Sequence, residues 1–427
     1  MKFFFADSLD YVDPNYDFLR DETHPGRQPY WDDQYPHEIL DLAPYDGILV
    51  SRATVGDHLF SGHYTDAQAM RFRRDGARRF LRFDKNGNKK LPVMADCGGF
   101  SYVKLEEPPY TVDDTIEFYE DGQFTYGCSV DHVIFEHFLD DREFSDVSSQ
   151  IQSRYDITLT NAEAFLKECN HRQASFEPIG IAQGWSAQSL AKATKDLVKM
   201  GYKYIALGGM VPLGAVQICN TLDAIVSEVR QAKKIKLHIL GFAKADQLGD
   251  FRKYPIHSFD TTSPLLRAFK DNVKNYFQIQ KTGGLEYFAA IRIPPAFGPS
   301  IQRRLIKPGK QQLESLVKLE KRALTGVRNY ATGTATIDEA LDPVMKYSRI
   351  TMWSDKRTET SNENKLVQLA AQYRRTLEER PWCSCTCAIC VNAGVETLIF
   401  RGSNRNKRRG FHNLFAYNQH LKAVLSS

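Results

Sequence analysis

The feature that most constrains the fold is a regular alternation of short apolar runs and helical patterns between residues 47 and 260. It is clearest after Ser186, where a capped helical pattern leads to the strand-like run Tyr204–Leu207, a second helical pattern and the run Lys236–Phe242. This β-α-β-α-β order is typical of a parallel sheet whose strands are joined by crossover helices. The sequence therefore predicts an α/β fold.

The number of strand-like runs predicts the kind of sheet. The predicted strands are Gly47–Ser51, Leu91–Ala95, Tyr126–Asp131, Pro178–Ala182, Tyr204–Leu207, Lys236–Phe242 and a run that ends at Asp260. This many strands alternating with helices favours a (β/α)8 TIM barrel, and a doubly wound open sheet is the alternative. The eighth strand is the least defined, and Glu286–Ile293 is its candidate.

The 427-residue chain is expected to have four parts. Residues 1–45 are rich in Asp, Tyr, Pro and His and lack periodicity, which predicts an irregular segment that wraps around a core. Residues 46–295 form the barrel, which carries the catalytic site. Residues 296–380 are expected to be a helical insertion, in which the role of residues 330–363 is open. Residues 381–427 hold a zinc-binding subdomain and a last helix.

Composition and charge exclude some classes of protein. Hydrophobic residues make up 42% and charged residues 25% of the chain, which is ordinary for a globular protein. The sequence has no run of ~18 apolar residues that could span a membrane. Its apolar start, Met-Lys-Phe-Phe-Phe-Ala, is too short for a signal peptide. A cytoplasmic protein with no membrane partner is therefore expected.

Two basic runs, Arg71–Arg82 and Arg401–Arg409, stand out against a net charge of only +4. Such clusters can bind the phosphates of a nucleic acid. A solvated helix face explains either run equally well. The candidate nucleic-acid-binding residues are Arg405, Lys407, Arg408 and Arg409.

A cluster of cysteines near the C-terminus predicts a metal site. Cys383, Cys385, Cys387 and Cys390 lie close together and are followed by His412. Thiolates at this spacing can converge on one tetrahedral ion, with a distant imidazole as the last ligand. We favour Cys385, Cys387, Cys390 and His412 as ligands of Zn²⁺, with Cys383 as a spare; an all-cysteine site and free reduced thiols are the alternatives. Four protein ligands leave no open position, so the zinc would be structural.

Polar residues follow several predicted strands at their carboxyl ends, where the chemistry of a TIM barrel takes place. They are Asp96, Asp131, Gln183, the pair Gly208-Gly209, and Asp260. One such Asp is usually only a cap, but several together predict a site. Two carboxylates on one bond can cleave a glycosidic linkage, because one attacks the anomeric carbon while the other handles the proton of the leaving group. The amide and the remaining carboxylate could hydrogen-bond the edge of a purine.

Five segments together resemble the queuine/archaeosine tRNA-guanine transglycosylase superfamily. They are Asp96-Cys97-Gly98-Gly99-Phe100, Gln183-Gly184, Leu207-Gly208-Gly209-Met210-Val211-Pro212, Phe259-Asp260, and the Cys-x-Cys-x-x-Cys tail with its later His-Asn-Leu. The resemblance implies a (β/α)8 barrel with a structural zinc subdomain. It also implies an enzyme that exchanges guanine in a polynucleotide for a 7-deazaguanine base.

The resemblance also implies roles for individual residues. Asp260 would be the nucleophile that attacks the sugar C1′ and forms a covalent intermediate. Asp96 would be the general acid and base. The substrate-binding set would be Asp131, Gln183, Gly208, Gly209 and Phe100, with Glu136 as the alternative to Asp131.

The chain departs from the bacterial tRNA enzymes in several respects. Cys97 stands where the superfamily usually has Ser, the gap between Cys390 and His412 is shorter, and no appended RNA-binding domain follows the cysteines. In these respects the chain is most similar to the DpdA branch, which implies DNA as the polynucleotide, preQ0 (7-cyano-7-deazaguanine) as the incoming base, and an accessory ATPase as a partner. The alternatives are a tRNA-guanine transglycosylase, a non-catalytic nucleic-acid-binding subunit and a zinc-dependent hydrolase.

Overall fold

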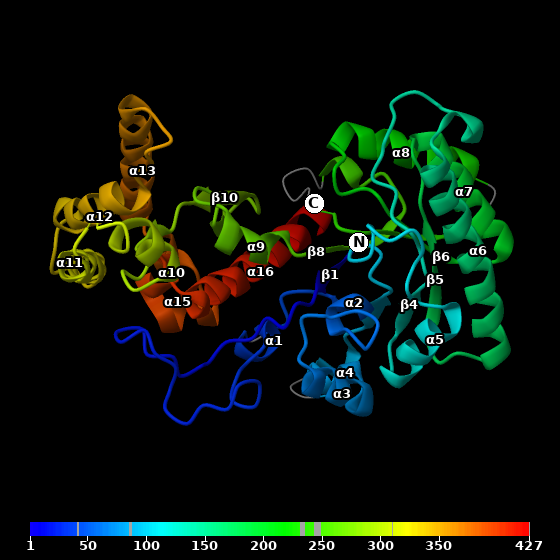
Figure 1. Cartoon of the computed structure of the whole chain (residues 1–427), viewed down its shortest axis with the longest axis horizontal. Helices are drawn as coiled ribbons and strands as arrows, with labels where there is room; N and C mark the ends of the chain where they lie inside the picture. The colour runs from blue at the N-terminus through cyan, green and yellow to red at the C-terminus, as the bar shows by residue number, and fades with distance from the viewer. Residues whose placement is uncertain (41, 85–87, 231–234, 243–248, 310, 427) are drawn as a thin grey trace. The chain divides into compact units, whose positions relative to one another are not determined.

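The computed structural model describes residues 1–40, 42–84, 88–230, 235–242, 249–309 and 311–426 (Figure 1). The chain forms two compact units. The barrel unit comprises Met1–Asp10, Tyr45–Thr262 and Val424–Ser427, and the second unit comprises Tyr11–Pro44 and Ser263–Ala423. The long central segment of the barrel unit thus ends at Thr262, whereas the sequence predicted the end of the barrel at residue 295.

The barrel unit is built on a closed barrel of parallel strands that pair in chain order. These strands are β1 (Lys2–Ala6), β2 (Gly47–Ser51), β3 (Val93–Asp96), β4 (Tyr126–Cys128), β5 (Glu177–Ala182), β6 (Tyr204–Leu207), β7 (Lys236–Ile239) and β8 (Ile256–Thr261). Helices follow the strands and cover the outside of the barrel (Figure 1). The predicted (β/α)8 fold is therefore confirmed.

The first strand of the barrel corrects the expectation for the N-terminal segment. Residues 2–6 form β1, which pairs with both β2 and β8, so that Phe4 lies opposite Gly47 on one side and Asp260 on the other. The Phe3–Phe5 run is buried, and this burial drives the segment into the barrel. No helix precedes the run in sequence, so the β-α periodicity could not reveal it.

The candidate for the eighth strand, Glu286–Ile293, lies outside the barrel. Part of it forms β10 (Leu285–Phe288), which pairs antiparallel with β9 (Tyr276–Ile279). The rest forms β11 (Ile291–Arg292), which pairs with β12 (Ile399–Phe400). The eighth position was already taken by the N-terminal strand, so this prediction was wrong.

The helices of the barrel unit begin at side-chain caps in several places. The helices are α2 (Arg52–Val55), α3 (Asp66–Asp75), α4 (Ala77–Phe80), α5 (Val112–Asp121), α6 (Ser149–Arg172), α7 (Ala187–Met200) and α8 (Ala215–Glu228). The Ser186 hydroxyl accepts a hydrogen bond from the Ser189 backbone and starts α7, as the sequence predicted. The buried face of α7 carries Leu190, Ala193 and Leu197, which fixes the helix against the barrel.

The second unit is mainly helical. Its helices are α1 (Pro36–Ile39), α9 (Ser263–Lys270), α10 (Pro299–Ile301), α11 (Leu313–Ala331), α12 (Ile337–Met352), α13 (Glu359–Glu379), α14 (Pro381–Ser384), α15 (Ala388–Ala393) and α16 (Ser403–Ser426), and a π-helical turn spans Gln302–Ile306. The previously unassigned residues 330–363 include α12, which packs on α11 and α13. None of the described helices is both long enough and apolar enough to cross a bilayer.

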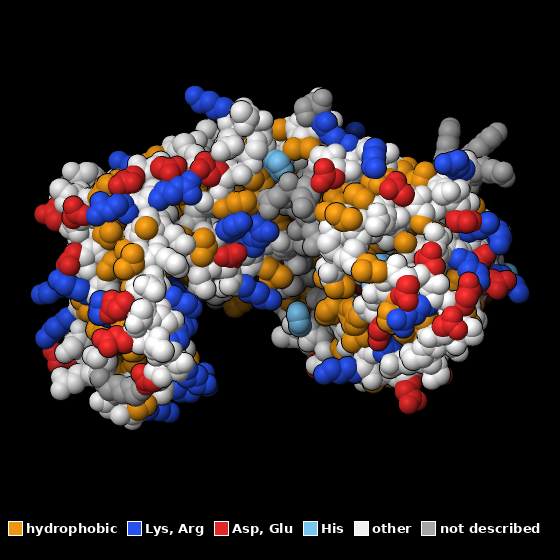
Figure 2. All heavy atoms as spheres, turned by 90° about the horizontal axis from the view of Figure 1, so that it is seen from above, with side chains coloured by type: hydrophobic (Ala, Val, Ile, Leu, Met, Phe, Trp, Pro, Cys, Tyr) orange, Lys and Arg blue, Asp and Glu red, His pale blue; other side chains and the backbone are white. Residues whose placement is uncertain are grey.

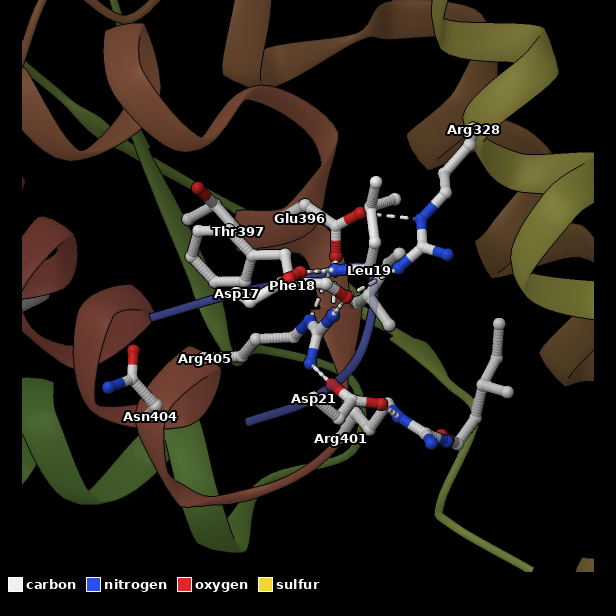
Figure 3. A network of polar contacts seen from close by, with 12 residues as sticks. Asp17, Phe18, Leu19, Asp21, Arg328, Glu396, Thr397, Arg401, Asn404 and Arg405 are labelled. Atoms are coloured by element: carbon white, nitrogen blue, oxygen red, sulfur yellow. Dashed lines mark hydrogen bonds and ion pairs between the residues drawn. The ribbon is translucent and has the colours of Figure 1, made fainter. Parts of the chain in front are cut away.

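Ion pairs inside the second unit join residues 11–44 to the C-terminal part of the chain (Figure 3). Arg401 and Arg405 both pair with Asp21. The Arg405 guanidinium also lies 2.8 Å from a carboxylate oxygen of Glu396, which binds Arg328 through its other oxygen at 2.7 Å. Since Arg405 is almost completely buried, its charge depends on these acidic partners.

This network corrects the expectation that the second basic run binds phosphates. Arg405, Arg408 and Arg409 are buried, and each already donates hydrogen bonds within the protein. Arg408 donates to the backbone oxygen of Asp13 at 2.7 Å, and Arg409 to that of Ala268 at 2.6 Å. Lys407 lies over the ring of Tyr11. On the face drawn in Figure 2, Lys and Arg side chains are interspersed with Asp and Glu. The three arginines are therefore structural.

Replacing Arg405 tests the weight of this network. Arg405→Met should lower the free energy of unfolding by about 3 kcal/mol, because Glu396 then loses a buried cation. The control Arg374→Met removes an exposed pair with Asp338 and should shift the unfolding midpoint far less, because solvent screens that pair. Urea unfolding followed by tryptophan fluorescence measures both, since Trp31, Trp353 and Trp382 belong to the second unit. Equal losses of unfolding free energy in the two variants would contradict the structural role of Arg405.

Candidate active site

A small cavity opens at the carboxyl ends of the barrel strands. Its volume is about 180 Å³. Drug-sized ligands occupy pockets of ~300–1,000 Å³, so this cavity suits one flat heterocycle. It is lined by Leu49, Asp96, Gly99, Phe100, Asp131, Val133, Phe135, Gln183, Gly208, Gly209, Val211, Leu240, Gly241 and Asp260. The structure thus brings together every catalytic and base-binding residue predicted from the sequence.

One wall of the cavity is a hydrogen-bonded pair formed by Asp131 and Gln183. The amide nitrogen of Gln183 donates to Oδ2 of Asp131 at 2.6 Å, and the Cys97 thiol donates to Oδ1 at 3.0 Å. The amide oxygen of Gln183 accepts from the backbone nitrogen of Ile134 at 3.3 Å. These contacts fix the orientation of both side chains, so they present defined acceptors and donors to a ligand. Glu136, the alternative to Asp131, is exposed and does not line the cavity.

Glycines leave room for this wall. A Cβ atom at Gly208 would lie 2.1 Å from the amide nitrogen of Gln183, and one at Gly99 would lie 2.7 Å from Oδ1 of Asp131. Gly209 has a φ of +70°, which favours glycine, and a Cβ there would meet the Ile134 carbonyl at 2.8 Å. Any side chain at these positions would displace the groups that form the wall.

Exposed apolar side chains surround the mouth of the cavity. Phe100 is 66% exposed, and its ring packs edge-on against Phe135 with a centroid distance of 5.6 Å. Val211 is also exposed. Phenylalanine faces left open beside a narrow cavity are suited to stacking on a flat ring.

Asp260 lies on β8 and is held by two donors. Its Oδ1 accepts from the backbone nitrogen of Gly241 at 2.9 Å and lies 3.2 Å from Nε2 of His238. These two contacts hold the carboxylate of Asp260 in a fixed orientation in a largely buried position.

Asp96, at the end of β3, has a different electrostatic environment. Burial, together with the negative charges of Asp131 and Asp260, raises the pKa of Asp96 to about 7. Hydrogen bonds from the Gly98 backbone and the Ser51 side chain oppose this shift. Burial also raises the pKa of Asp131. Near neutral pH, Asp96 can therefore both donate and accept a proton.

A full-length relative identifies the family. No protein-family model matches the chain. A curated protein from Salmonella montevideo, named DNA-guanine transglycosylase, is 38% identical over 430 residues, which cover 100% of this chain and 98% of that protein. This chain belongs to the guanine transglycosylase family. The cavity of this transglycosylase is lined by three carboxylates, those of Asp96, Asp131 and Asp260.

The transglycosylase also has a cluster of ligand atoms in its second unit. Cys385, Cys387, Cys390 and His412 place their ligand atoms within 4.8 Å of one another. The three sulfur atoms lie 3.5, 3.4 and 3.3 Å from Nδ1 of His412. A tetrahedral zinc site with Zn–S of about 2.3 Å and Zn–N of about 2.0 Å requires nearly this separation. The cluster could therefore hold a metal ion such as zinc.

The surroundings of His412 support its part in this cluster. Nε2 of His412 donates to the backbone oxygen of Phe277 at 2.6 Å, which leaves Nδ1 facing the thiols. Metal-ligating histidines are usually fixed by such a hydrogen bond. Cys383 is exposed and is not part of the cluster, in agreement with its expected role as a spare.

Sequence reasoning missed three residues near the carboxylates. His238 was hidden in a predicted strand, although a histidine in an otherwise apolar strand was a usable signal. Phe135 follows Asp131 closely, but nothing in its sequence context indicated a cavity. Ser51 ends β2 next to Asp96 in the parallel register, which only the strand pairing could reveal.

The raised pKa of Asp96 predicts how stability depends on pH. The unfolded chain ionises this group near 3.8, whereas the folded chain keeps the proton up to about pH 7. Deprotonation of Asp96 therefore lowers the free energy of unfolding progressively as the pH rises from the first value to the second. Above about pH 7 this loss of stability no longer grows. The side chain of Asp96→Asn stays neutral, so the melting temperature of this variant relative to the wild type should be higher at pH 8 than at pH 5. A difference between the two melting temperatures that stays constant across this range would contradict the raised pKa.

The metal cluster predicts a stoichiometry. The purified protein should contain one metal ion per chain by elemental analysis, and Cys390→Ser should lose it, because three ligands bind zinc far more weakly than four. The matched control Cys383→Ser should retain the ion. Retention in Cys390→Ser together with loss in Cys383→Ser would reassign the ligands.

Proposed function

We propose that this protein exchanges guanine in DNA for a 7-deazaguanine base, preQ0, by double displacement through a covalent bond between Asp260 and the sugar. The observation that carries the proposal is a base-sized cavity lined by Asp96 and Asp260 together with the Asp131–Gln183 pair. The name of the Salmonella relative supports DNA as the polynucleotide.

In the first step, Asp260 displaces guanine. One oxygen of the ionised carboxylate forms a bond to C1′ while the bond between C1′ and guanine N9 breaks. The electron pair of that bond stays on the guanine, and Asp96 supplies the proton that lets the base leave neutral. The phosphodiester backbone is not cut.

In the second step, the incoming base displaces the Asp260 carboxylate from the sugar. Asp96, now ionised, takes the N9 proton of the 7-deazaguanine base. That nitrogen forms a bond to C1′, and the bond between C1′ and the Asp260 oxygen breaks, which restores the carboxylate. A pKa near 7 allows Asp96 to serve both steps without a large cost in either direction.

The cavity wall would recognise both bases by their shared edge. Guanine and its 7-deaza relatives carry the same amine and N–H donors on the pyrimidine ring, which a carboxylate such as Asp131 can accept. Phe100 can stack on the ring. The target guanine must leave its base stack to reach the cavity, at a cost of a few kcal/mol in a duplex.

We infer that the cysteine cluster holds structural Zn²⁺. Cys385, Cys387, Cys390 and His412 would fill a tetrahedral shell, and such an ion supplies folding energy rather than chemistry. The cluster joins β9, α15 and α16 within the second unit.

The proposal is tested with radiolabelled preQ0 and purified DNA. The wild type should incorporate label, and Asp260→Ala should reduce the rate by roughly 10³-fold or more, because the nucleophile is lost. Asp140→Ala is the matched control, since it removes an exposed carboxylate. A wild-type covalent adduct with DNA should persist in denaturing gels and be absent from Asp260→Ala.

Two outcomes would contradict the proposal. Incorporation that survives Asp260→Ala would exclude Asp260 as the nucleophile. Incorporation into tRNA but not into DNA would reassign the substrate to the tRNA class.

A further inference from the structure

A row of buried polar side chains runs from the barrel interior to Asp260. The Tyr204 hydroxyl lies 2.5 Å from the Ser258 hydroxyl, which lies 2.6 Å from Nδ1 of His238. Nε2 of His238 lies 3.2 Å from Oδ1 of Asp260. Tyr204, His238 and Ser258 are all completely buried. The mechanism above does not use any of these three side chains.

The chemistry of the groups sets the direction of these hydrogen bonds. An ionised carboxylate has no hydrogen to give, so Nε2 of His238 must donate to Asp260. In a neutral imidazole, Nδ1 is then an acceptor, and the Ser258 hydroxyl donates to it. The remaining lone pairs of that hydroxyl accept from Tyr204. Hydrogen bonds therefore run one way, from Tyr204 through Ser258 and His238 to Asp260.

The two oxygens of Asp260 have different surroundings. Among the described residues, both donors to the carboxylate, His238 and the Gly241 backbone, bind Oδ1. Oδ2 is the oxygen left for the sugar. Fixing one oxygen with two donors also fixes the rotation of the carboxylate, which is a way of holding a nucleophile in its attacking geometry.

The geometry points to His238 as a positioning residue for the nucleophile, held in its Nε2–H form by Ser258 and Tyr204. This inference rests on the proposed function, because it assigns Oδ2 of Asp260 to the bond with C1′.

The hydrogen bond from His238 matters most when the covalent intermediate breaks down. While Asp260 is an ester, Oδ1 is a neutral carbonyl oxygen and accepts only weakly. As the bond between C1′ and Oδ2 breaks, negative charge returns to the carboxylate, and Nε2–H stabilises it. Loss of this donor should therefore slow release of the sugar more than binding of either substrate.

Two amide variants separate the roles of the imidazole nitrogens. The side-chain nitrogen of Gln lies near the position of Nε2, and that of Asn lies near the position of Nδ1. His238→Gln can therefore still donate to Asp260, whereas His238→Asn can reach only Ser258. We expect His238→Asn to lower kcat by roughly 10- to 100-fold with KM for the base nearly unchanged, the size of one charge-assisted hydrogen bond. His238→Gln should remain within a few-fold of the wild type.

The covalent adduct gives a second measurement. At steady state, a larger fraction of His238→Asn than of wild-type protein should carry DNA in denaturing gels, because breakdown is slowed. Equal kcat values in the Gln and Asn variants, or a change confined to KM, would overturn the positioning role. A wild type that neither exchanges base nor forms an adduct would instead overturn the proposed function.

The state of the imidazole can be measured without activity. In ¹⁵N NMR spectra of histidine-labelled protein, the signals absent from His238→Gln identify His238. We expect a protonated Nε2 and an unprotonated Nδ1 in the wild type, and a mixture of tautomers in Ser258→Ala. A wild-type signal with hydrogen on Nδ1 alone would overturn the inference.

Discussion

Closure of the barrel by its N-terminal strand is the constraint on which the site depends. β1 lies between β2 and β8, and its register places Phe4 opposite Asp260. The next pairings, β1 with β2 and β2 with β3, carry this register on to Asp96, which lies opposite Ser51. Two carboxylates 164 positions apart in sequence thus reach the same rim through backbone hydrogen bonds alone. The buried Phe3–Phe5 run supplies the apolar area that keeps this strand in place.

The cavity places similar carboxylates in different surroundings, as the proposed division of roles among them requires. Asp260 has two polar contacts on one oxygen, whereas Asp96 is half-buried and faces the charges of its neighbours. Asp131 is bound by a thiol and an amide. The same functional group is thereby suited to attack on carbon, to proton transfer and to recognition of a base.

The sequence was informative where polar residues follow a strand directly. Reading the strand ends predicted that six residues share one site, and all of them line the same cavity: Asp96, Asp131, Gln183, Gly208, Gly209 and Asp260. The metal cluster was found from cysteine spacing, and Cys383 was correctly left out. Predictions from the sequence were wrong where the environment of a residue depends on residues far away in the chain. The role of Phe3–Phe5 is decided by a strand made some 250 residues later, and Arg405 of the last helix pairs with Asp21 and Glu396. A basic run in sequence carries no information about such partners.

The division of the chain between the two units has a consequence for its synthesis. Residues 11–44 leave the ribosome early but belong to the unit completed last, because the arginines that pair with Asp21 lie at positions 401 and 405. For most of translation this acidic, aromatic segment has no native partner. A nascent chain that has already made β8 contains all the strands of its barrel, yet residues 11–44, between β1 and β2, still lack the arginines with which they pair. Premature termination after the barrel would thus leave residues 11–44 without their native partners, and an unfolded segment of this kind is a preferred site of proteolytic cleavage.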